Sequence, residues 1–328
     1  MRIIFMGTPD FAVNTLRALI ESKHDVIGSV CQPDRRKGRG RKMHAPPVKQ
    51  VALEKNIPVW QPEKPNRRIF SDMLSEKQPD LIVVVAYGHI LKRRILTLPR
   101  FGCVNVHASL LPGYRGAAPI QAALFSNDEK TGVTVMQMDR GMDTGDILLK
   151  RETDIDPDET GEELSERLSH LGADALMQTL DIIENGEASP VSQDHEQASY
   201  APKIIKEDQL ADWSETDRKI HDRVRAFSPK PGLGTELSDL NLRVKIVRTR
   251  RESGKIWCNI KQVAPGTILE IDKKRGILVA TGSDPIRIIQ VHPQNRKPIH
   301  IRDFLLGYSV KIGMVFRSLT KRIKKRNK

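Results

Sequence analysis

The sequence predicts an α/β protein with an open, mostly parallel β-sheet, followed by a smaller antiparallel β domain. Strands alternate with helices over residues 1–155, an order that is typical of a parallel sheet covered by helices on both faces. The predicted strands are also apolar nearly throughout, as strands buried on both sides are. After residue 200 the pattern changes to short strands separated by turn residues, which indicates a small barrel or sandwich.

The first part of the chain contains five apolar runs and two amphipathic segments. The runs span residues 3–6, 25–31, 81–86, 103–106 and 133–138. A helix is predicted for residues 11–20, behind the helix-starting Thr8-Pro9-Asp10. A second helix is predicted for residues 161–184, where leucine, isoleucine and alanine recur at helical spacing.

A polar segment separates the two parts. Residues 185–202 are rich in Gly, Ser, Pro, Gln and Glu and show little periodicity, which suits a connection between domains. Beyond it we predict a helix over 213–227 and strands over 242–247, 266–271, 276–280 and 286–291. The predicted organisation is therefore a first domain over 1–200, a second domain with a linker helix over 201–314 and a basic tail over 315–328.

Length and composition agree with two soluble domains. A chain of 328 residues exceeds what one hydrophobic core usually organises. The longest apolar runs, residues 3–7 and 81–86, are too short to span a membrane, and Thr8-Pro9-Asp10 interrupts any signal peptide. Cys31, Cys103 and Cys258 lie far apart without metal-ligand spacing. We therefore expect a cytoplasmic protein with reduced thiols and no membrane partner.

The net charge of +13 is distributed unevenly along the chain. Residues 1–200 contain 25 Lys and Arg against 28 Asp and Glu, whereas the remainder contains 29 against 13. The second part thus carries about +16, which predicts a polyanionic partner for it. The alternative is a basic surface that serves solubility alone, because charge does not determine the fold.

Polar residues that directly follow the apolar runs are the candidates for chemistry, because ligands of open α/β sheets bind beyond the carboxyl ends of the strands. The first such turn, residues 7–11, lacks the three-glycine spacing that seats a pyrophosphate, so a nicotinamide cofactor is not expected. Asn105 and His107 close the fourth run and project to one face, because they are two residues apart on a strand. An amide beside an imidazole can hold a carbonyl oxygen as it becomes an oxyanion. Taken alone, the pair also fits an ordinary strand end with satisfied polar groups.

Asp143 lies in a glycine-containing loop, residues 140–146, directly after the fifth run. A turn-forming role is one interpretation of this carboxylate. The other is that it meets His107 at the same sheet edge, orients the imidazole and receives a proton from an attacking ammonium group. The sequence contains no Gly-x-Ser-x-Gly elbow, no His adjacent to a cysteine and no catalytic metal spacing. Direct attack by an amine, without a metal or a covalent enzyme intermediate, therefore fits best.

Residues 105–120, Asn-Val-His-Ala-Ser-Leu-Leu-Pro-Gly-Tyr-Arg-Gly-Ala-Ala-Pro-Ile, resemble the signature of the folate-dependent formyltransferases. Residues 136–145 resemble the second motif of that family, and the similarity runs from residue 3 to about 307. The resemblance implies a Rossmann-like formyltransferase domain followed by a small OB-like β-barrel. Within the family, the chain is most similar to the branch that formylates the α-amine of methionyl initiator tRNA with 10-formyltetrahydrofolate.

The resemblance also implies roles for particular residues. Asn105, His107 and Asp143 match the residues that carry the transfer, and Ser109, Leu110, Leu111 and Pro112 match the segment that lines the folate site. No metal and no obligate protein partner are implied.

A basic loop at residues 35–42 fits a nucleic-acid substrate independently, because six positive charges with two glycines can approach a phosphate backbone closely. The candidate tRNA contacts are Arg35, Lys37, Arg39, Arg41 and Lys42, with Arg39 at the Gly-Arg-Gly position of the family. The alternative for the loop is a solvated surface.

Two kinds of rival function remain. Related formyltransferases act on glycinamide ribonucleotide or on nucleotide-linked amino sugars. The first group generally lacks the second domain. The second group has one, but would not predict a basic loop beside the active site together with so basic a remainder. The other rival is a catalytically inactive RNA-binding protein with the same fold, for which the basic charge alone would account for the sequence. The complete set of Asn105, His107 and Asp143 argues against that reading.

Overall fold

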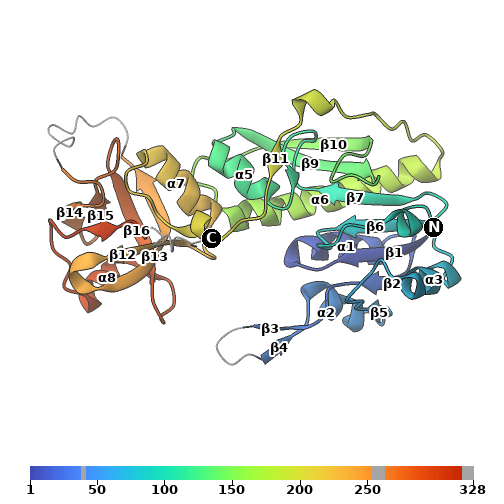
Figure 1. Ribbon diagram of the computed structural model, residues 1–328, viewed down its shortest axis with the longest axis horizontal. Helices are drawn as coiled ribbons and strands as arrows, with labels where there is room; N and C mark the ends of the chain where they lie inside the picture. The colour runs from blue at the N-terminus through green and yellow to red at the C-terminus, as the bar shows by residue number, and fades with distance from the viewer. Residues whose placement is uncertain (38–41, 253–262, 320–328) are drawn as a thin grey trace, which may run out of the picture. The chain divides into compact units, whose positions relative to one another are not determined.

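The computed structural model describes residues 1–37, 42–252 and 263–319, and these form two compact units (Figure 1). The first unit comprises Met1–Pro119, Lys130–Asp154 and Ser165–Pro202. The second comprises Ile120–Glu129, Ile155–Leu164 and the chain from Lys203 onward. Two short segments from the first 200 residues thus belong to the second unit, and no sequence pattern indicated them.

The first unit is built on one seven-stranded sheet with the order β10-β9-β7-β6-β1-β2-β5. Its strands are β1 (Arg2–Gly7), β2 (Asp25–Val30), β5 (Val59–Trp60), β6 (Leu81–Val85), β7 (Cys103–His107), β9 (Lys130–Gln137) and β10 (Ile147–Asp154). The five strands from β7 to β5 run parallel, whereas β9 and β10 are antiparallel to their neighbours. The expected open, mostly parallel sheet is confirmed.

Helices cover both faces of this sheet, as the continuously apolar strands predict. On one face, Ile4 and Met6 of β1 join a core cluster with Phe70 and Leu74 of α3 (Arg68–Glu76). On the other, Gly172 of α6 (Gly161–Glu184) approaches β7 and β9 so closely that a Cβ there would lie 2.8 Å from Val106 Cγ1. Further α-helices among the described residues of this unit are α1 (Val13–Glu21), α2 (Pro47–Glu54) and α4 (Arg93–Leu96).

Sequence periodicity located most of these elements. The five apolar runs coincide with β1, β2, β6, β7 and β9, and the predicted helix over 161–184 coincides with α6. The predicted helix over 11–20 starts as a 3-10 turn, Asp10–Ala12, and continues as α1. The sequence did not identify β10, because no position of this edge strand is fully buried and its charged second half breaks the apolar pattern.

The second unit contains a curled antiparallel sheet with the order β14-β15-β16-β13-β12-β18, and β17 pairs with β16. Its strands are β12 (Leu233–Leu237), β13 (Leu242–Arg251), β14 (Ile268–Asp272), β15 (Gly276–Val279), β16 (Ile286–Pro293), β17 (Ile299–His300) and β18 (Phe316–Arg317). Hydrogen bonds from Ile268 N to Met314 O and from Phe316 N to Gly266 O, each 2.8 Å, connect the two ends of the sheet. The expected barrel-like second domain is confirmed. Strand β18 lies beyond residue 314, where the sequence prediction ended this domain.

The core of the second unit is packed around Trp213, which is 1% exposed and donates from Nε1 to Thr235 Oγ1 at 3.1 Å. The helix predicted over 213–227 is shorter in the structure, where α7 spans Asp217–Ala226. Thr216 caps it by accepting a hydrogen bond from Lys219 N, so the residues before it form a turn instead. Helix α8 (Ile301–Gly307) contributes Phe304 to the same core.

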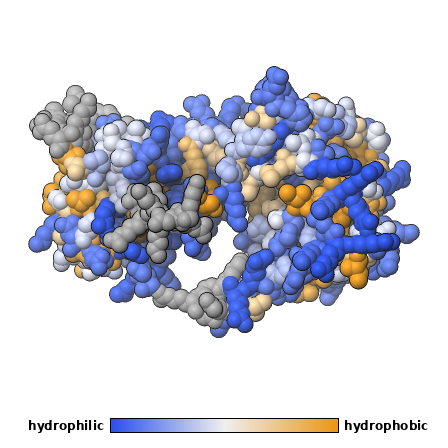
Figure 2. All heavy atoms as spheres, viewed as in Figure 1, coloured by the Kyte–Doolittle hydropathy of each residue, from blue (hydrophilic) through white to orange (hydrophobic). Residues whose placement is uncertain are grey.

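No helix of the described residues is long and apolar enough to cross a membrane. Most of the molecular face in Figure 2 is hydrophilic, with hydrophobic residues scattered over it. Cys31 and Cys103 are free thiols, as predicted, and burial raises the pKa of Cys103 to about 12. Cys258 lies outside the described residues.

Candidate active site

The carboxyl end of β7 carries Asn105 and His107, as the sequence predicts. Asn105 pairs in register with Met136 and His107 with Thr134 of the antiparallel neighbour β9. Because the two residues alternate with Val106, their side chains leave the strand on the same face. Asn105 is 8% exposed and His107 6% exposed, so both polar groups act where little water competes.

The Asn105 side chain has no hydrogen-bond partner among the residues that the structure describes. A buried amide usually has one, and an amide left without a partner has donors to offer to a ligand. Asn105 is therefore suited to donate to an oxygen atom that arrives with a substrate.

The imidazole of His107 has a defined donor side. Nε2 lies 3.0 Å from the main-chain oxygen of Tyr114. A carbonyl oxygen can only accept, so Nε2 carries a proton and donates it to Tyr114. Nδ1 faces the other way and lies 3.8 Å from Asp143 Oδ2, beyond direct hydrogen-bond range. Any proton that His107 exchanges during a reaction is therefore the one on Nδ1.

Asp143 is held in the loop between β9 and β10. Its Oδ2 accepts a hydrogen bond of 2.8 Å from the main-chain N–H of Gly116. Oδ1 accepts none from the described residues, and 17% of the side chain is exposed. The residue has a φ of +55°, a left-handed conformation in which Asp is more frequent than most residues. One carboxylate oxygen is thus anchored while the other is open to a ligand.

Glycine is required two residues after Asp143 for steric reasons. A Cβ on Gly145 would lie 1.8 Å from the main-chain oxygen of Gln137, the last residue of β9. Because the clash is with backbone, no side-chain rotation relieves it. This close approach brings the loop back onto the sheet directly after Asp143.

The segment from Ser109 to Pro112 follows β7 and is fixed by its own hydrogen bonds. Ser109 Oγ donates to Gly113 O at 2.6 Å, and Thr134 Oγ1 donates to Ser109 O at 2.7 Å. Ser109 and Leu111 are buried, whereas Leu110 and Pro112 are partly exposed. Of the four predicted folate residues, Leu110 and Pro112 have side chains that a ligand can reach.

Two sequence profiles match this chain. One described as "Formyl transferase" matches residues 1–180, and one described as "Formyl transferase, C-terminal domain" matches residues 203–309. The chain belongs to the formyl transferase family. The predicted resemblance is confirmed.

Members of the formyl transferase family from bacteria resemble the chain over nearly its whole length. The methionyl-tRNA formyltransferase of Geobacter metallireducens is 46% identical over 314 residues, which are 96% of this chain and 98% of that protein. That of Clostridioides difficile is 42% identical over 315 residues, or 96% and 99% of the two chains. A solved N-formyltransferase of Helicobacter canadensis, in complex with folinic acid and dTDP-3-aminofucose, has a TM-score of 0.67 at 17% identity and covers 89% of this chain and 99% of that chain. The last likeness shows a shared fold.

The predicted basic loop of this formyl transferase family member begins and ends in a two-stranded hairpin, β3 (Arg35–Lys37) and β4 (Lys42–His44). Arg35 and Lys42 are exposed, and Arg39 and Arg41 lie outside the described residues. The hairpin follows β2, which is the third strand from β7 in a parallel array. The hairpin therefore starts at the same edge of the sheet as the catalytic candidates. At the usual strand spacing, the ends of β2 and β7 lie about 14 Å apart along that edge.

The segment at 185–202, which the sequence suggested as a connection, leads to the boundary between the two units and also contributes to the site. Gln193 is 6% exposed and donates to the main-chain oxygens of Asp143 and Gly145. Arg115, inside the family signature, is 2% exposed and donates to Gln193. Neither residue was predicted as part of the site; Gln193 is a single Gln in a polar stretch, which shows no periodicity.

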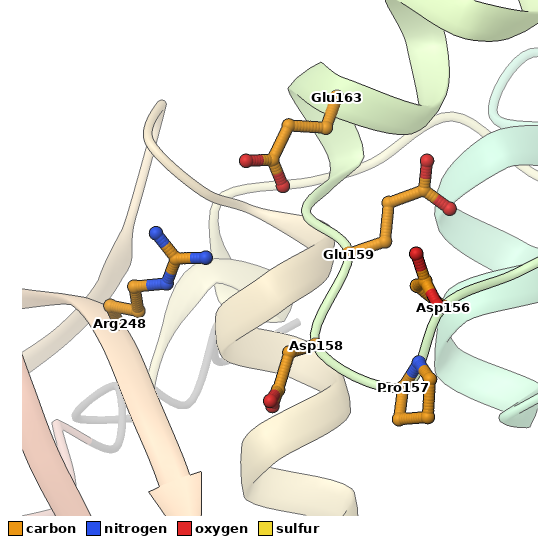
Figure 3. Close-up of a pocket in the computed structure, with 6 residues that line it drawn as sticks. All are labelled: Asp156, Pro157, Asp158, Glu159, Glu163 and Arg248. Carbon is orange, nitrogen blue, oxygen red and sulfur yellow. The ribbon is translucent and has the colours of Figure 1, made fainter.

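An acidic pocket in the second unit is a poor candidate for a formyl donor or an RNA. Arg248 of β13 points toward a loop and a helix start that contribute carboxylates (Figure 3). The lining residues are Asp156, Pro157, Asp158, Glu159, Glu163 and Arg248. Carboxylates outnumber the one guanidinium, so the pocket repels anions. The described residues also contain no cluster of His, Cys, Asp and Glu that could hold a metal ion.

Proposed function

We propose that the chain transfers the formyl group of 10-formyltetrahydrofolate to the α-amino group of methionyl initiator tRNA, giving formylmethionyl-tRNA. The observation that carries the proposal is the similarity, over 96% of this chain, to proteins named methionyl-tRNA formyltransferase. The arrangement of Asn105, His107 and Asp143 supports it, because each has an unused polar atom at one sheet edge.

The reaction begins with attack of the neutral methionyl amine on the formyl carbon. A new N–C bond forms, and the formyl oxygen becomes an oxyanion. The Asn105 amide donates to this oxygen, and a protonated His107 donates to it from Nδ1, since Nε2 is engaged with Tyr114. Donors that are already in place stabilise developing charge strongly at a buried site.

Asp143 handles the proton of the amine. Its open oxygen accepts a proton from the ammonium form, either before attack or as the tetrahedral species forms. Collapse then breaks the bond between the formyl carbon and the donor nitrogen, which takes up the proton that Asp143 accepted and leaves as tetrahydrofolate. Gly116 holds the second oxygen of Asp143 throughout, so the carboxylate keeps its direction.

Leu110 and Pro112 provide an apolar contact for the folate donor. Both are partly exposed directly after β7, and the loop that bears them is anchored to β9 through Thr134. An apolar wall with few polar groups is typical of sites for flat heterocycles.

The exposed charges of the β3–β4 hairpin, together with the basic second part, fit the phosphate backbone of the acceptor. We propose that Arg35, Lys37, Arg39, Arg41 and Lys42 contact the tRNA.

The choice of acceptor is tested by offering three amines with the same donor. We expect purified protein to formylate methionyl initiator tRNA with a kcat/KM at least about 10³-fold above that for glycinamide ribonucleotide or a nucleotide-linked amino sugar, because only the tRNA engages the basic surfaces. Product is measured as acid-stable formylmethionine or by mass spectrometry of the small amines. Faster transfer to either small amine rejects the tRNA assignment.

Neutralising the hairpin is expected to weaken tRNA use selectively. The double variant Arg35→Ala/Lys42→Ala should raise the KM for tRNA about tenfold and reduce its salt dependence, because two phosphate contacts are lost. The KM for the folate donor should change less than about twofold. Lys55→Ala/Lys77→Ala is the matched control, since both lysines are exposed and precede the amino ends of β5 and β6, at the opposite sheet edge. Equal effects of the two double variants would show that the hairpin has no special role.

A further inference from the structure

Gln193 connects a buried guanidinium to the loop that carries Asp143. Its Nε2 donates to Asp143 O at 3.0 Å and to Gly145 O at 2.7 Å. Its Oε1 accepts from Arg115 Nε at 3.1 Å and from Arg115 Nη2 at 2.6 Å. Both donors and both acceptor positions of the Gln193 amide group are therefore in use, and the side chain is 6% exposed.

Only an amide satisfies both ends of this arrangement. A guanidinium can only donate, so the Gln193 oxygen must face Arg115. The two carbonyl oxygens can only accept, so the NH₂ group must face the loop. A carboxylate at this position keeps the contact with Arg115 but places its second oxygen against two carbonyl oxygens. The network therefore selects glutamine over the nearly isosteric glutamate.

The Arg115 guanidinium is not part of an ion pair within the described residues. Its other side-chain contact runs from Nη2 to His195 Nδ1, at 3.0 Å. A buried charge without a carboxylate is costly, so hydrogen bonds to Gln193 and His195 must compensate for it. The adjacent residue, Gly116, donates its N–H to Asp143 Oδ2. Asp143 is thus held at two points. The N–H of Gly116 binds its carboxylate, and Gln193, which accepts from Arg115, binds its main-chain oxygen.

Asp143 needs this support because its backbone is strained. A non-glycine residue at a φ of +55° costs on the order of 1 kcal/mol relative to the usual regions, and such a conformation persists only where surrounding contacts fix it. Hydrogen bonds at both Asp143 O and Gly145 O hold the loop on either side of Thr144.

We propose that Gln193 is a positioning residue that, with Arg115 behind it, fixes the main chain of Asp143 so that the open carboxylate oxygen faces the reacting amine. The inference rests on the proposed role of Asp143. A shift of about 1 Å in a catalytic group can lower a rate about 100-fold, and that sets the scale of the expected effect.

The test is Gln193→Glu, assayed for formyl transfer to methionyl initiator tRNA alone and combined with Asp143→Asn. We expect kcat to fall about 10- to 100-fold, with the KM for donor and tRNA changed less than about threefold. Gln193→Met, which lacks both sets of hydrogen bonds, should lose a similar factor, so the result does not depend on one variant folding. Gln197→Glu is the matched control, because Gln197 is exposed four residues away and its Nε2 donates to Asp194 Oδ2 at 2.7 Å rather than to the Asp143 loop. It should retain the parental kcat.

The double variant decides between positioning and general damage. If Gln193 acts through Asp143, adding Gln193→Glu to Asp143→Asn lowers kcat by no more than about twofold further. A full 10- to 100-fold further loss overturns the inference, as does a parental kcat for Gln193→Glu. Parental activity of Asp143→Asn alone would instead remove the proposed catalytic role, which separates that failure from a failure of the inference.

Discussion

Asp143→Asn is expected to lower kcat for formyl transfer by about 10²- to 10⁴-fold, the range associated with loss of a general base. The substitution changes almost nothing else. An asparagine oxygen can still accept from Gly116 N–H, as Oδ2 does at 2.8 Å, and Asn tolerates the φ of +55° found here. What disappears is the charge on the open oxygen that receives the amine proton. Binding of donor and tRNA should therefore remain, and the loss should lie in kcat.

Steady-state kinetics with a binding assay for tRNA measure this effect, and Asp146→Asn provides the control. Asp146 lies in the same loop, and its Oδ1 accepts from Ser192 Oγ at 2.9 Å rather than contacting His107. The control makes the same change in charge, so its kcat should stay within about threefold of the parent. A similar loss in both variants would mean that loop charge, and not proton transfer by Asp143, limits the rate.

The fold was predictable wherever burial imposes a simple pattern. Strand β6 is buried at every position and β1 at all but its first, so a run of apolar residues suffices to locate each. Edge strands lack that pattern. In β10, charged residues such as Lys150 and Arg151 are exposed, and pairing with β9 rather than side-chain burial makes the segment a strand.

The location of Asn105, His107 and Asp143 at one sheet edge was predictable because open α/β sheets collect function at the carboxyl ends of strands. The hydrogen bonds around them were not. Arg115 and Gln193 are 78 residues apart, and Gln193 meets Asp143 across 50 residues, so no local pattern records these contacts. The ring nitrogen from which His107 donates is likewise set by a contact that the sequence does not show. Nε2 donates to the main-chain oxygen of Tyr114, whose position depends on a backbone φ of +58° at that residue.

The same limit applies to the second unit, where the sequence predicted a helix starting at Trp213. Spacing alone cannot separate a helical apolar residue from a core residue in a preceding turn. Here the side chain of Thr216 starts the helix, and Trp213 is buried against the barrel through Thr235. A capping residue is therefore a better guide to the first turn than the first large apolar residue.

His107→Ala is expected to reduce kcat by about 10³-fold, equivalent to about 4 kcal/mol of transition-state stabilisation. The variant loses the donor at Nδ1, which faces the reacting groups, and leaves Asn105 as the remaining predicted oxyanion donor. Binding of tRNA should be largely unchanged, because the β3–β4 hairpin follows β2, the third strand away from β7. Single-turnover formylation and tRNA binding, measured on the same preparation, separate the two effects.

The same variant also removes the partner of Tyr114 O, so a loss of activity could arise from a displaced loop. Two further measurements distinguish these causes. Imidazole added to the assay should restore part of the activity of His107→Ala, because a small donor can enter the vacated space, whereas a displaced loop is not repaired in this way. His170→Ala, at an exposed position of α6, should retain full activity. An imidazole-independent loss, accompanied by weakened tRNA binding, would assign His107 to holding the Tyr114 loop, and the oxyanion would then depend on Asn105 alone.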